Sequence, residues 1–155
     1  MTGNAMPEPI LVSACLLGLS TRYDGQSKRN DKVLVYLRRE NLQPIPICPE
    51  QLAGLPTPRP KSFFASGGGS DVLDGNGLLV QENGTDVGEA FIRGAAESLK
   101  LAQLAGCRRA LFKDGSPSCG VHRIYLGAEQ VAGQGVTTAL LLRHGLQFIS
   151  EGDLL

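Results

Sequence analysis

Three of the four cysteines in the chain occupy equivalent positions, each just beyond the end of a predicted buried strand. They are Cys15 after the strand 10–14, Cys48 after the strand 44–47, and Cys119 after the strand 109–113 and its following turn. If these strands lie parallel in one sheet, the three thiols emerge at the edge where open α/β folds bind their ligands. Three converging thiolates indicate a metal or cluster with one open coordination position. An open position, in turn, indicates chemistry.

The spacing of the cysteines is a weak signal when taken alone. The sequence has no C-x-x-C pair, which disfavours a zinc ribbon, and it has no ferredoxin-type run of cysteines. Small apolar cysteines also fill space near strand ends, so simple burial stays open as an alternative. Cys107 differs from the others because it follows Gly106 and precedes a strand. We expect it at the opposite edge of the sheet, in a structural role.

The residues next to the cysteines favour a reactive site. The segment 116–120 is a tight loop of small residues, and it can turn amide groups and the Ser118 hydroxyl toward an anion or a cluster sulfide. In Cys48-Pro49-Glu50, a carboxylate follows a strand-end thiol by two residues. Glu50 suits general acid or base chemistry if it faces the same pocket, and it is otherwise a solvated loop residue.

Three further polar residues are weaker candidates. Asp24 lies in the Arg22-Tyr23-Asp24-Gly25 segment after Cys15, either as part of a polar cluster or in a surface turn, because Asp-Gly is a common turn pair. His122 either orients a substrate and donates a proton, or lies exposed on a loop. His144, in the last turn of a predicted helix, receives no function.

The elements that position these residues follow from hydrophobic periodicity and from turn signals. We expect a helix over 31–40, capped by Asn30 or Asp31. A second helix covers 86–105, with Thr85 as its cap and Gly106 at its end, and a third covers 136–144. A hairpin-like excursion surrounds 78–80, and a last strand covers 146–149. The Gly/Pro-rich insert 53–70 is expected to be irregular, either a mobile flap or a segment ordered by a ligand.

This order of elements predicts the fold class. We expect an α/β fold with a mostly parallel sheet and helices on its faces, in a Rossmann-like three-layer arrangement with a Gly/Pro-rich insert. We expect residues 1–155 to form a single domain with a core of about 9–150, and residues 1–8 to form a flexible N-terminal segment.

Composition narrows the class of protein. Fifteen Lys and Arg balance fifteen Asp and Glu, so a nucleic-acid partner has no electrostatic support. No apolar run reaches the roughly 18 residues of a membrane span, and the N-terminus does not read as a signal peptide. We therefore expect a cytoplasmic protein whose thiols stay reduced, which favours metal binding, redox use or burial over disulfides.

Five motifs, in order, resemble a family long catalogued as a domain of unknown function, whose characterised members are 2-thiouracil desulfidases. The motifs are Ile10 to Gly18, Arg22 to Gly25, Ile47 to Glu50, Gly54 to Pro60, and Ser116 to Gly120. The likeness runs from about residue 9 to residue 150. One departure is Leu126 before Gly127, where an aspartate often precedes the glycine.

The resemblance implies a cofactor, an activity and partners. It implies a [4Fe–4S] cluster held by Cys15, Cys48 and Cys119, with one iron that has no protein ligand and can bind the substrate's sulfur. The implied reaction removes sulfur hydrolytically from a thiolated pyrimidine such as 2-thiouracil and gives uracil and sulfide. The implied partners are that small thiolated base and the cluster-assembly machinery; from the charge balance and the lack of a long apolar run, we expect no nucleic acid and no membrane.

By position, the resemblance places catalytic roles on Glu50 and Ser118. A soft thiocarbonyl sulfur prefers iron, which acts as a Lewis acid on the C–S bond. Water then attacks with Glu50 as base, and Ser118 holds a ring nitrogen or the new oxygen, without net electron transfer. Asp24 is the next candidate base, because its loop leaves the same edge of the sheet.

Two other functions compete with this interpretation. A non-catalytic Fe–S or metal-binding module in sulfur handling would use the same cysteines, but it would not need Glu50 and Ser118. A nucleotide-binding domain with incidental thiols is disfavoured, because no GxGxxG fingerprint follows the first strand.

Overall fold

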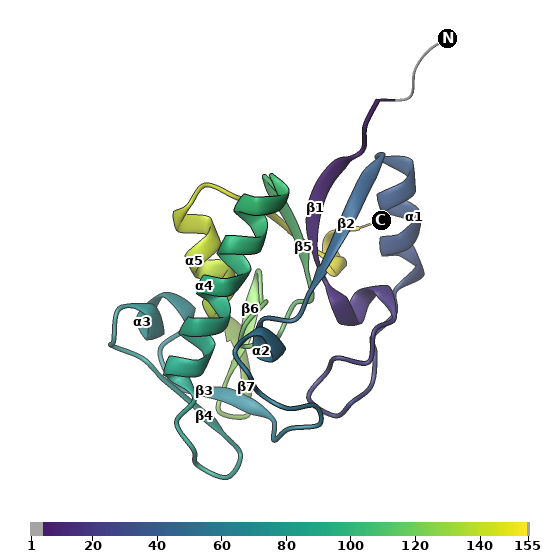
Figure 1. Cartoon of the computed structure of the whole chain (residues 1–155). Helices are drawn as coiled ribbons and strands as arrows, with labels where there is room; N and C mark the ends of the chain where they lie inside the picture. Colours follow the sequence, from purple (N-terminus) through teal and green to yellow (C-terminus); the bar gives the residue numbers. More distant parts are fainter. Residues whose placement is uncertain (1–4, 155) are drawn as a thin grey trace.

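Four parallel strands that end at a common edge form sheet A, one of two four-stranded sheets in the described part of the chain (Figure 1). The computed structural model describes residues 5–154. In sheet A the order is β2-β1-β5-β8, with bounds Glu8–Ser13 for β1, Leu42–Ile47 for β2, Arg109–Phe112 for β5 and Gln147–Ser150 for β8. Sheet A therefore confirms the expectation of an α/β fold built on a mostly parallel sheet.

Helices cover both faces of strand β1. Successive side chains of a strand point to opposite faces, and Ile10, Leu11 and Val12 are all fully buried. Ile10 packs in a cluster with Val33 of α1 (Asp31–Arg39). Leu11 packs in a different cluster, with residues of α4 (Gly88–Ala105) and α5 (Val136–Arg143). The continuous apolar run 10–14 thus forms a strand buried on both sides, as predicted.

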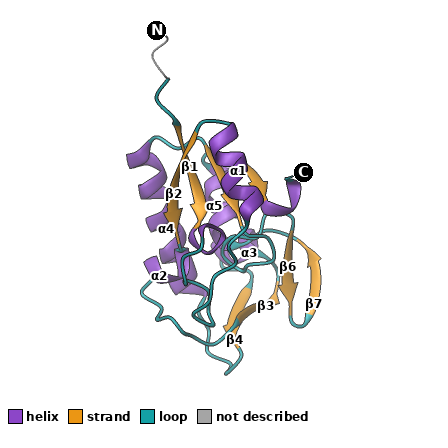
Figure 2. Ribbon diagram, turned by 90° about the vertical axis from the view of Figure 1, so that its right-hand side faces the viewer, coloured by secondary structure: helices purple, strands orange, loops and turns teal. Residues whose placement is uncertain are grey.

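A second sheet, sheet B, was not predicted from the sequence, whereas the strands expected at 10–14, 44–47, 109–113 and 146–149 all lie in sheet A. The order of sheet B is β4-β3-β6-β7, with bounds Ser62–Ser66 for β3, Leu78–Gln81 for β4, Arg123–Leu126 for β6 and Glu129–Ala132 for β7. It is mixed, because β3 pairs parallel with β6 while the two hairpin pairs are antiparallel. Figure 2 shows sheet B below the ends of β1 and β2.

The insert 53–70 is consequently not irregular throughout. It contains β3, and its last residues begin the short helix α3 (Gly69–Leu73). Long-range pairing explains the error: Phe64 lies beside Leu79 and Leu126, which are distant in the chain, and it is fully buried between them. Burial against partners remote in sequence outweighs the local Pro and Gly signals.

The predicted helix ends are partly right. Asn30 Oδ1 accepts the amide of Lys32 at 3.0 Å and caps α1, and Gly106 ends α4 at φ 72°. Thr85 does not cap α4, which begins at Gly88; Asp86 Oδ1 accepts the Gly88 amide at 2.9 Å instead. The hairpin-like excursion is present as a bridge between Val80 and Asp86.

Two strands of sheet A, β2 and β1, also differ slightly from expectation. Strand β2, with Pro44 and Pro46, is an edge strand of six residues, and an edge tolerates proline because one side of the strand makes no ladder bonds. Strand β1 already begins at Glu8, which pairs with Leu42, so Glu8 belongs to the sheet although it was expected in the flexible segment. Residues 1–4 of that segment lie outside the described residues.

Between residues 5 and 154, no helix combines the length and the apolar character needed to cross a membrane.

Candidate active site

A cavity of about 360 Å³ lies between the common edge of sheet A and the strands of sheet B. Its sheet A side carries Cys15, Cys48 and Cys119, and sheet B contributes Ser62 and Tyr125. The structure thus brings the three strand-end cysteines to one cavity at the ends of parallel strands.

Each of the three cysteines reaches the cavity through the element that follows its strand. Cys15 lies in the 3-10 helix η1 (Ala14–Leu17), and Cys48 is the N-cap residue of the helix α2 (Pro49–Leu52). Strands β1 and β2 are in register at Ser13 and Ile47, so both chains leave the sheet side by side. Cys119 arrives from the loop after β5 and is buried, whereas the other two are half-buried.

The three thiols lie close enough to affect one another's ionisation. Burial raises the pKa of Cys15 to about 11 and that of Cys119 to about 12, and it also raises the pKa of Cys48. The charge of Cys48 adds to the rise at Cys15, and the charges of Cys48 and Cys15 add to the rise at Cys119. Without a metal, these sulfurs are therefore neutral thiols at pH 7, and a bound cation would be needed to keep them as thiolates.

Cys107 lies apart from this group. It does not line the cavity, and burial and the charge of Glu8 raise its pKa. Because Glu8 begins β1, Cys107 lies at the opposite end of the sheet from the three other cysteines.

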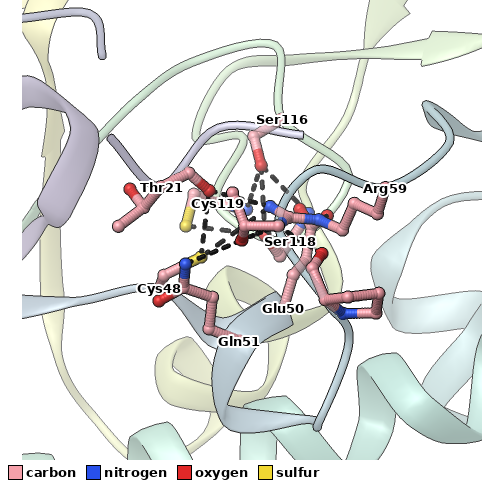
Figure 3. A network of polar contacts seen from close by, with 10 residues as sticks. Thr21, Cys48, Glu50, Gln51, Arg59, Ser116, Ser118 and Cys119 are labelled. Atoms are coloured by element: carbon pink, nitrogen blue, oxygen red, sulfur yellow. Dashed lines mark hydrogen bonds and ion pairs between the residues drawn. The ribbon is translucent and has the colours of Figure 1, made fainter. Parts of the chain in front are cut away.

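Glu50 is held in place from both sides within the cavity wall (Figure 3). Pro49 starts the short helix α2, which places Glu50 in the first turn. The Ser118 hydroxyl donates to Glu50 Oε2 at 3.1 Å, and Arg59 Nε donates to Oε1 at 2.9 Å. The Glu50 side chain is only 12% exposed. The structure therefore presents an oriented, largely buried carboxylate in the wall of the cavity that the three thiols line.

The loop 116–120 orients Ser118 and Cys119, but not in the way its composition suggested. Ser116 Oγ accepts the amide of Cys119 at 3.0 Å and the amide of Ser118 at 3.2 Å. These two amides thus point at Ser116 and not at a ligand. The Ser118 hydroxyl is the group directed into the site, and it also lies 3.7 Å from Cys119 Sγ.

The structure excludes Asp24 and His122 from the cavity. Asp24 forms a surface turn, in which its Oδ1 accepts the Gln26 amide at 3.0 Å, and it pairs with Arg22. Its loop does leave the same edge of the sheet, and its partner Arg22 lines the cavity, but Asp24 itself is not one of the lining residues. His122 is 56% exposed and contacts Asp153 at 2.9 Å.

Several cavity residues were not assigned from the sequence. Arg59 lies between two prolines of the Gly54 to Pro60 motif, and a charged residue in such a stiff segment was the available signal. Lys113 lines the cavity and is held by Glu151 at 3.2 Å. No local pattern marks Lys113, because Glu151 comes from the other end of the chain.

Asp114 was also missed, and it organises the loop that carries Cys119. Its side chain is fully buried, and its Oδ1 accepts the amides of Gly115, Val121, His122 and Arg123. Burial acts to raise the pKa of Asp114, but these four amide donors outweigh it and hold the pKa below its usual value.

The donor set fits a cluster better than a single ion. Within the described part of the chain, no group of three or more His, Cys, Asp or Glu side chains is placed to hold one metal ion. The thiolates of an iron–sulfur cluster bind different irons and do not converge on one atom. Three soft sulfur donors spaced around an open cavity satisfy that requirement.

Comparisons with known proteins agree with this chemistry. A family model described as 2-thiouracil desulfurase matches residues 10–153. The chain is 38% identical over 148 residues to the uncharacterized protein YbbK of Bacillus subtilis (strain 168), covering 94% of this chain and 97% of that protein. It also resembles a solved structure described as the [4Fe-4S]-dependent thiouracil desulfidase TudS (DUF523Vcz), with a TM-score of 0.81 and 47% identity, covering 95% of this chain and 93% of the other.

Proposed function

Because the chain belongs to the 2-thiouracil desulfurase family, we propose that it removes sulfur hydrolytically from a thiolated pyrimidine such as 2-thiouracil, giving uracil and sulfide. The observation that carries the proposal is the placement of Glu50. Its carboxylate is fixed by Ser118 and Arg59 in the wall of the same cavity that the three cysteines line.

Cys15, Cys48 and Cys119 are the residues that would hold a [4Fe–4S] cluster, leaving one iron without a protein ligand. When bound, such a cluster supplies a sulfur-seeking Lewis acid that weakens the C–S bond.

Glu50 serves as the general base. Its carboxylate accepts a proton from the attacking water while the water oxygen bonds to the thiocarbonyl carbon. The C–S bond breaks, and the sulfur leaves with both bonding electrons and takes up the protons as hydrogen sulfide. Water supplies the oxygen and the protons, so the reaction balances without an oxidant or reductant.

Ser118 orients both the base and the substrate. Its hydroxyl now donates to Glu50 Oε2 at 3.1 Å, and it can rotate toward a ring nitrogen or toward the oxygen that forms on the pyrimidine. Tyr125 and Gln130 line the sheet B side, where they offer hydrogen-bond partners to the remaining edge of the ring. A protein that only stored or carried a cluster would have no use for a carboxylate fixed in this way.

Replacing Glu50 by Gln tests the proposal. Glu50→Gln keeps shape and hydrogen bonding but removes the base, and general-base catalysis contributes about 10²–10⁴-fold. We expect the cluster absorbance of the anaerobically loaded protein to stay near wild type, while sulfide release from 2-thiouracil falls by that factor.

Glu97→Gln is the matched control, because Glu97 pairs with Lys100 on the surface of α4 and does not line the cavity. Its turnover should equal that of wild type. A Glu50→Gln variant that turns over like wild type would contradict the role of Glu50. A fully loaded wild type that releases no sulfide from any thiolated base would contradict the enzyme and favour the binding module.

A further inference from the structure

Arg59 is a deeply buried charged residue of the cavity wall to which the proposed reaction assigns no role. Its side chain is 3% exposed. The Arg59 amide donates to the Tyr23 carbonyl at 2.8 Å, which ties its segment to the loop that follows Cys15. A guanidinium buried this far from water needs partners for its charge and for its donors.

Every N–H of the Arg59 guanidinium has an acceptor within the protein. A guanidinium has five N–H donors. Nε donates to Glu50 Oε1 at 2.9 Å. Nη1 donates to the Pro56 carbonyl at 3.3 Å and to Thr57 Oγ1 at 2.8 Å. Nη2 donates to the Thr21 carbonyl at 3.0 Å and to Cys48 Sγ at 3.9 Å. No donor remains for a substrate, so any effect of Arg59 on the reaction passes through these partners.

Two of those partners belong to the proposed reaction centre. Glu50 is the proposed base, and Cys48 is a proposed cluster ligand. The planar fork of Arg59 reaches both at once and fixes their relative position. The Thr21 carbonyl holds the same Nη2 in place, because it accepts from it at 3.0 Å; in the absence of a cluster it also accepts from the Cys48 thiol at 3.7 Å.

We propose that Arg59 is a positioning residue that holds the Glu50 carboxylate and the Cys48 sulfur as one rigid unit. The proposal rests on the proposed function, since it assigns Arg59 to the base and to the ligand of that same site. The Gly54 to Pro60 motif would then serve to place the Arg59 guanidinium between the proposed base, Glu50, and a proposed cluster ligand, Cys48.

The test is Arg59→Lys in the cluster-loaded protein, with 2-thiouracil as the probe. Lysine keeps the positive charge, but its single nitrogen cannot span Glu50, Thr21 and Cys48. We expect kcat to fall at least about tenfold, with KM within about threefold of wild type, because the lost contacts position groups and do not bind substrate.

The reduction potential of the cluster gives a readout that does not depend on turnover. Hydrogen bonds to the cluster sulfurs contribute to the potential. Losing the Nη2 contact leaves more negative charge on Cys48 Sγ and disfavours adding an electron, so the potential of Arg59→Lys should shift downward. Arg93→Lys is the matched control: Arg93 is exposed, contacts the nearby Ala53 carbonyl at 3.4 Å and does not line the cavity, so kcat and potential should stay unchanged.

A double-mutant cycle separates positioning from general damage. If Arg59 acts through Glu50, adding Arg59→Lys to Glu50→Gln should lower turnover by much less than it does in wild type, whereas structural damage would add in full. Thr57→Val decides the question if Arg59→Lys does not fold, since it removes one anchor of Nη1 and leaves Arg59 present. We expect about a threefold loss of kcat there, at constant KM.

Unchanged kcat and potential in the folded variant, or a rise in KM at constant kcat, would overturn the proposal. Fully additive losses in the double variant would overturn it as well. These outcomes are distinct from failure of the proposed function, in which the wild-type protein itself releases no sulfide.

Discussion

At the scale of the residue, the surroundings of a cysteine depend on whether it follows a strand or precedes one. Cys15, Cys48 and Cys119 follow the ends of β1, β2 and β5 and line the cavity, whereas Cys107 precedes β5 and lies beside Glu8 at the other edge. Burial alone does not distinguish the two groups, because Cys107 and Cys119 are both buried.

Serine substitutions test this division. We expect Cys15→Ser, Cys48→Ser and Cys119→Ser each to lose the cluster, because a hard oxygen suits the soft iron–sulfide core poorly. Cys107→Ser should keep cluster and activity. Iron and sulfide quantitation with anaerobic absorption spectra measures the outcome, and a brown, active Cys119→Ser protein would contradict the ligand assignment.

At the scale of the element, the site depends on backbones that approach each other closely. Helix α2, which carries Glu50, rests on α4 at Gly94, where a Cβ atom would overlap the Pro49 carbonyl oxygen. The N-terminus of α5 meets the cysteine loop in the same way, since a Cβ at Gly135 would press on the backbone of Ser118. Glycine is required at both positions for lack of space.

Gly94→Ala tests this packing. Alanine raises helix propensity by up to about 1 kcal/mol, but overpacking against a backbone oxygen costs about 1–3 kcal/mol, so we expect net destabilisation. The displacement of α2 should also lower turnover. Urea unfolding and sulfide release measure the two effects, and Lys100→Ala, on the exposed face of α4, should change neither. A Gly94→Ala protein as stable and active as wild type would show that α2 can move without consequence.

At the scale of the whole molecule, the C-terminal turn η2 (Glu151–Asp153) closes onto the cysteine loop. Glu151 Oε1 accepts the Asp114 amide at 2.8 Å, and Asp153 contacts His122 at 2.9 Å. The end of the chain therefore helps to fix the loop that carries Cys119.

This closure predicts a pH-dependent stability. The hydrogen bond with Asp153 chiefly raises the pKa of His122 above 6.5, with the charges of Asp153 and Asp114 adding to the rise and burial and Arg123 opposing it. The Ser150 amide and His122 hold the pKa of Asp153 below 3.8. The contribution of His122 to the free energy of unfolding is complete below its pKa in the unfolded chain and is lost as pH rises through its pKa in the folded protein. The contribution of Asp153 is lost as pH falls through its pKa in the folded protein.

The pair therefore stabilises most between pH 3.8 and 6.5. Because both side chains are well exposed, His122→Gln should lower the free energy of unfolding by only about 0.2–1 kcal/mol at pH 5, and the difference should vanish at alkaline pH. Urea titrations at several pH values measure it. A difference of equal size at pH 5 and at pH 9 would contradict an ionic contribution.

The sequence by itself determined the features that depend on local pattern. The apolar run 10–14 predicts a strand buried on both faces, and the stripe along α4 with Gly106 predicts that helix and its end, because periodicity and turn chemistry are properties of neighbouring residues. The positions of three cysteines after parallel strands also follow from local order, since parallel strands end at one edge.

Only the tertiary structure decided the rest, because it depends on pairs that are distant in the chain. Sheet B depends on the pairing of Phe64 with Leu126, and no local sequence pattern predicts this pairing. Glu50 meets Ser118 across 68 residues. Asp24, whose loop leaves the same edge as the cysteines, does not line the cavity, and its carboxylate is occupied by the Gln26 amide and by Arg22. The side chains that face a common cavity come from segments that are remote in the chain. Local sequence patterns do not determine how close such segments lie in the folded protein.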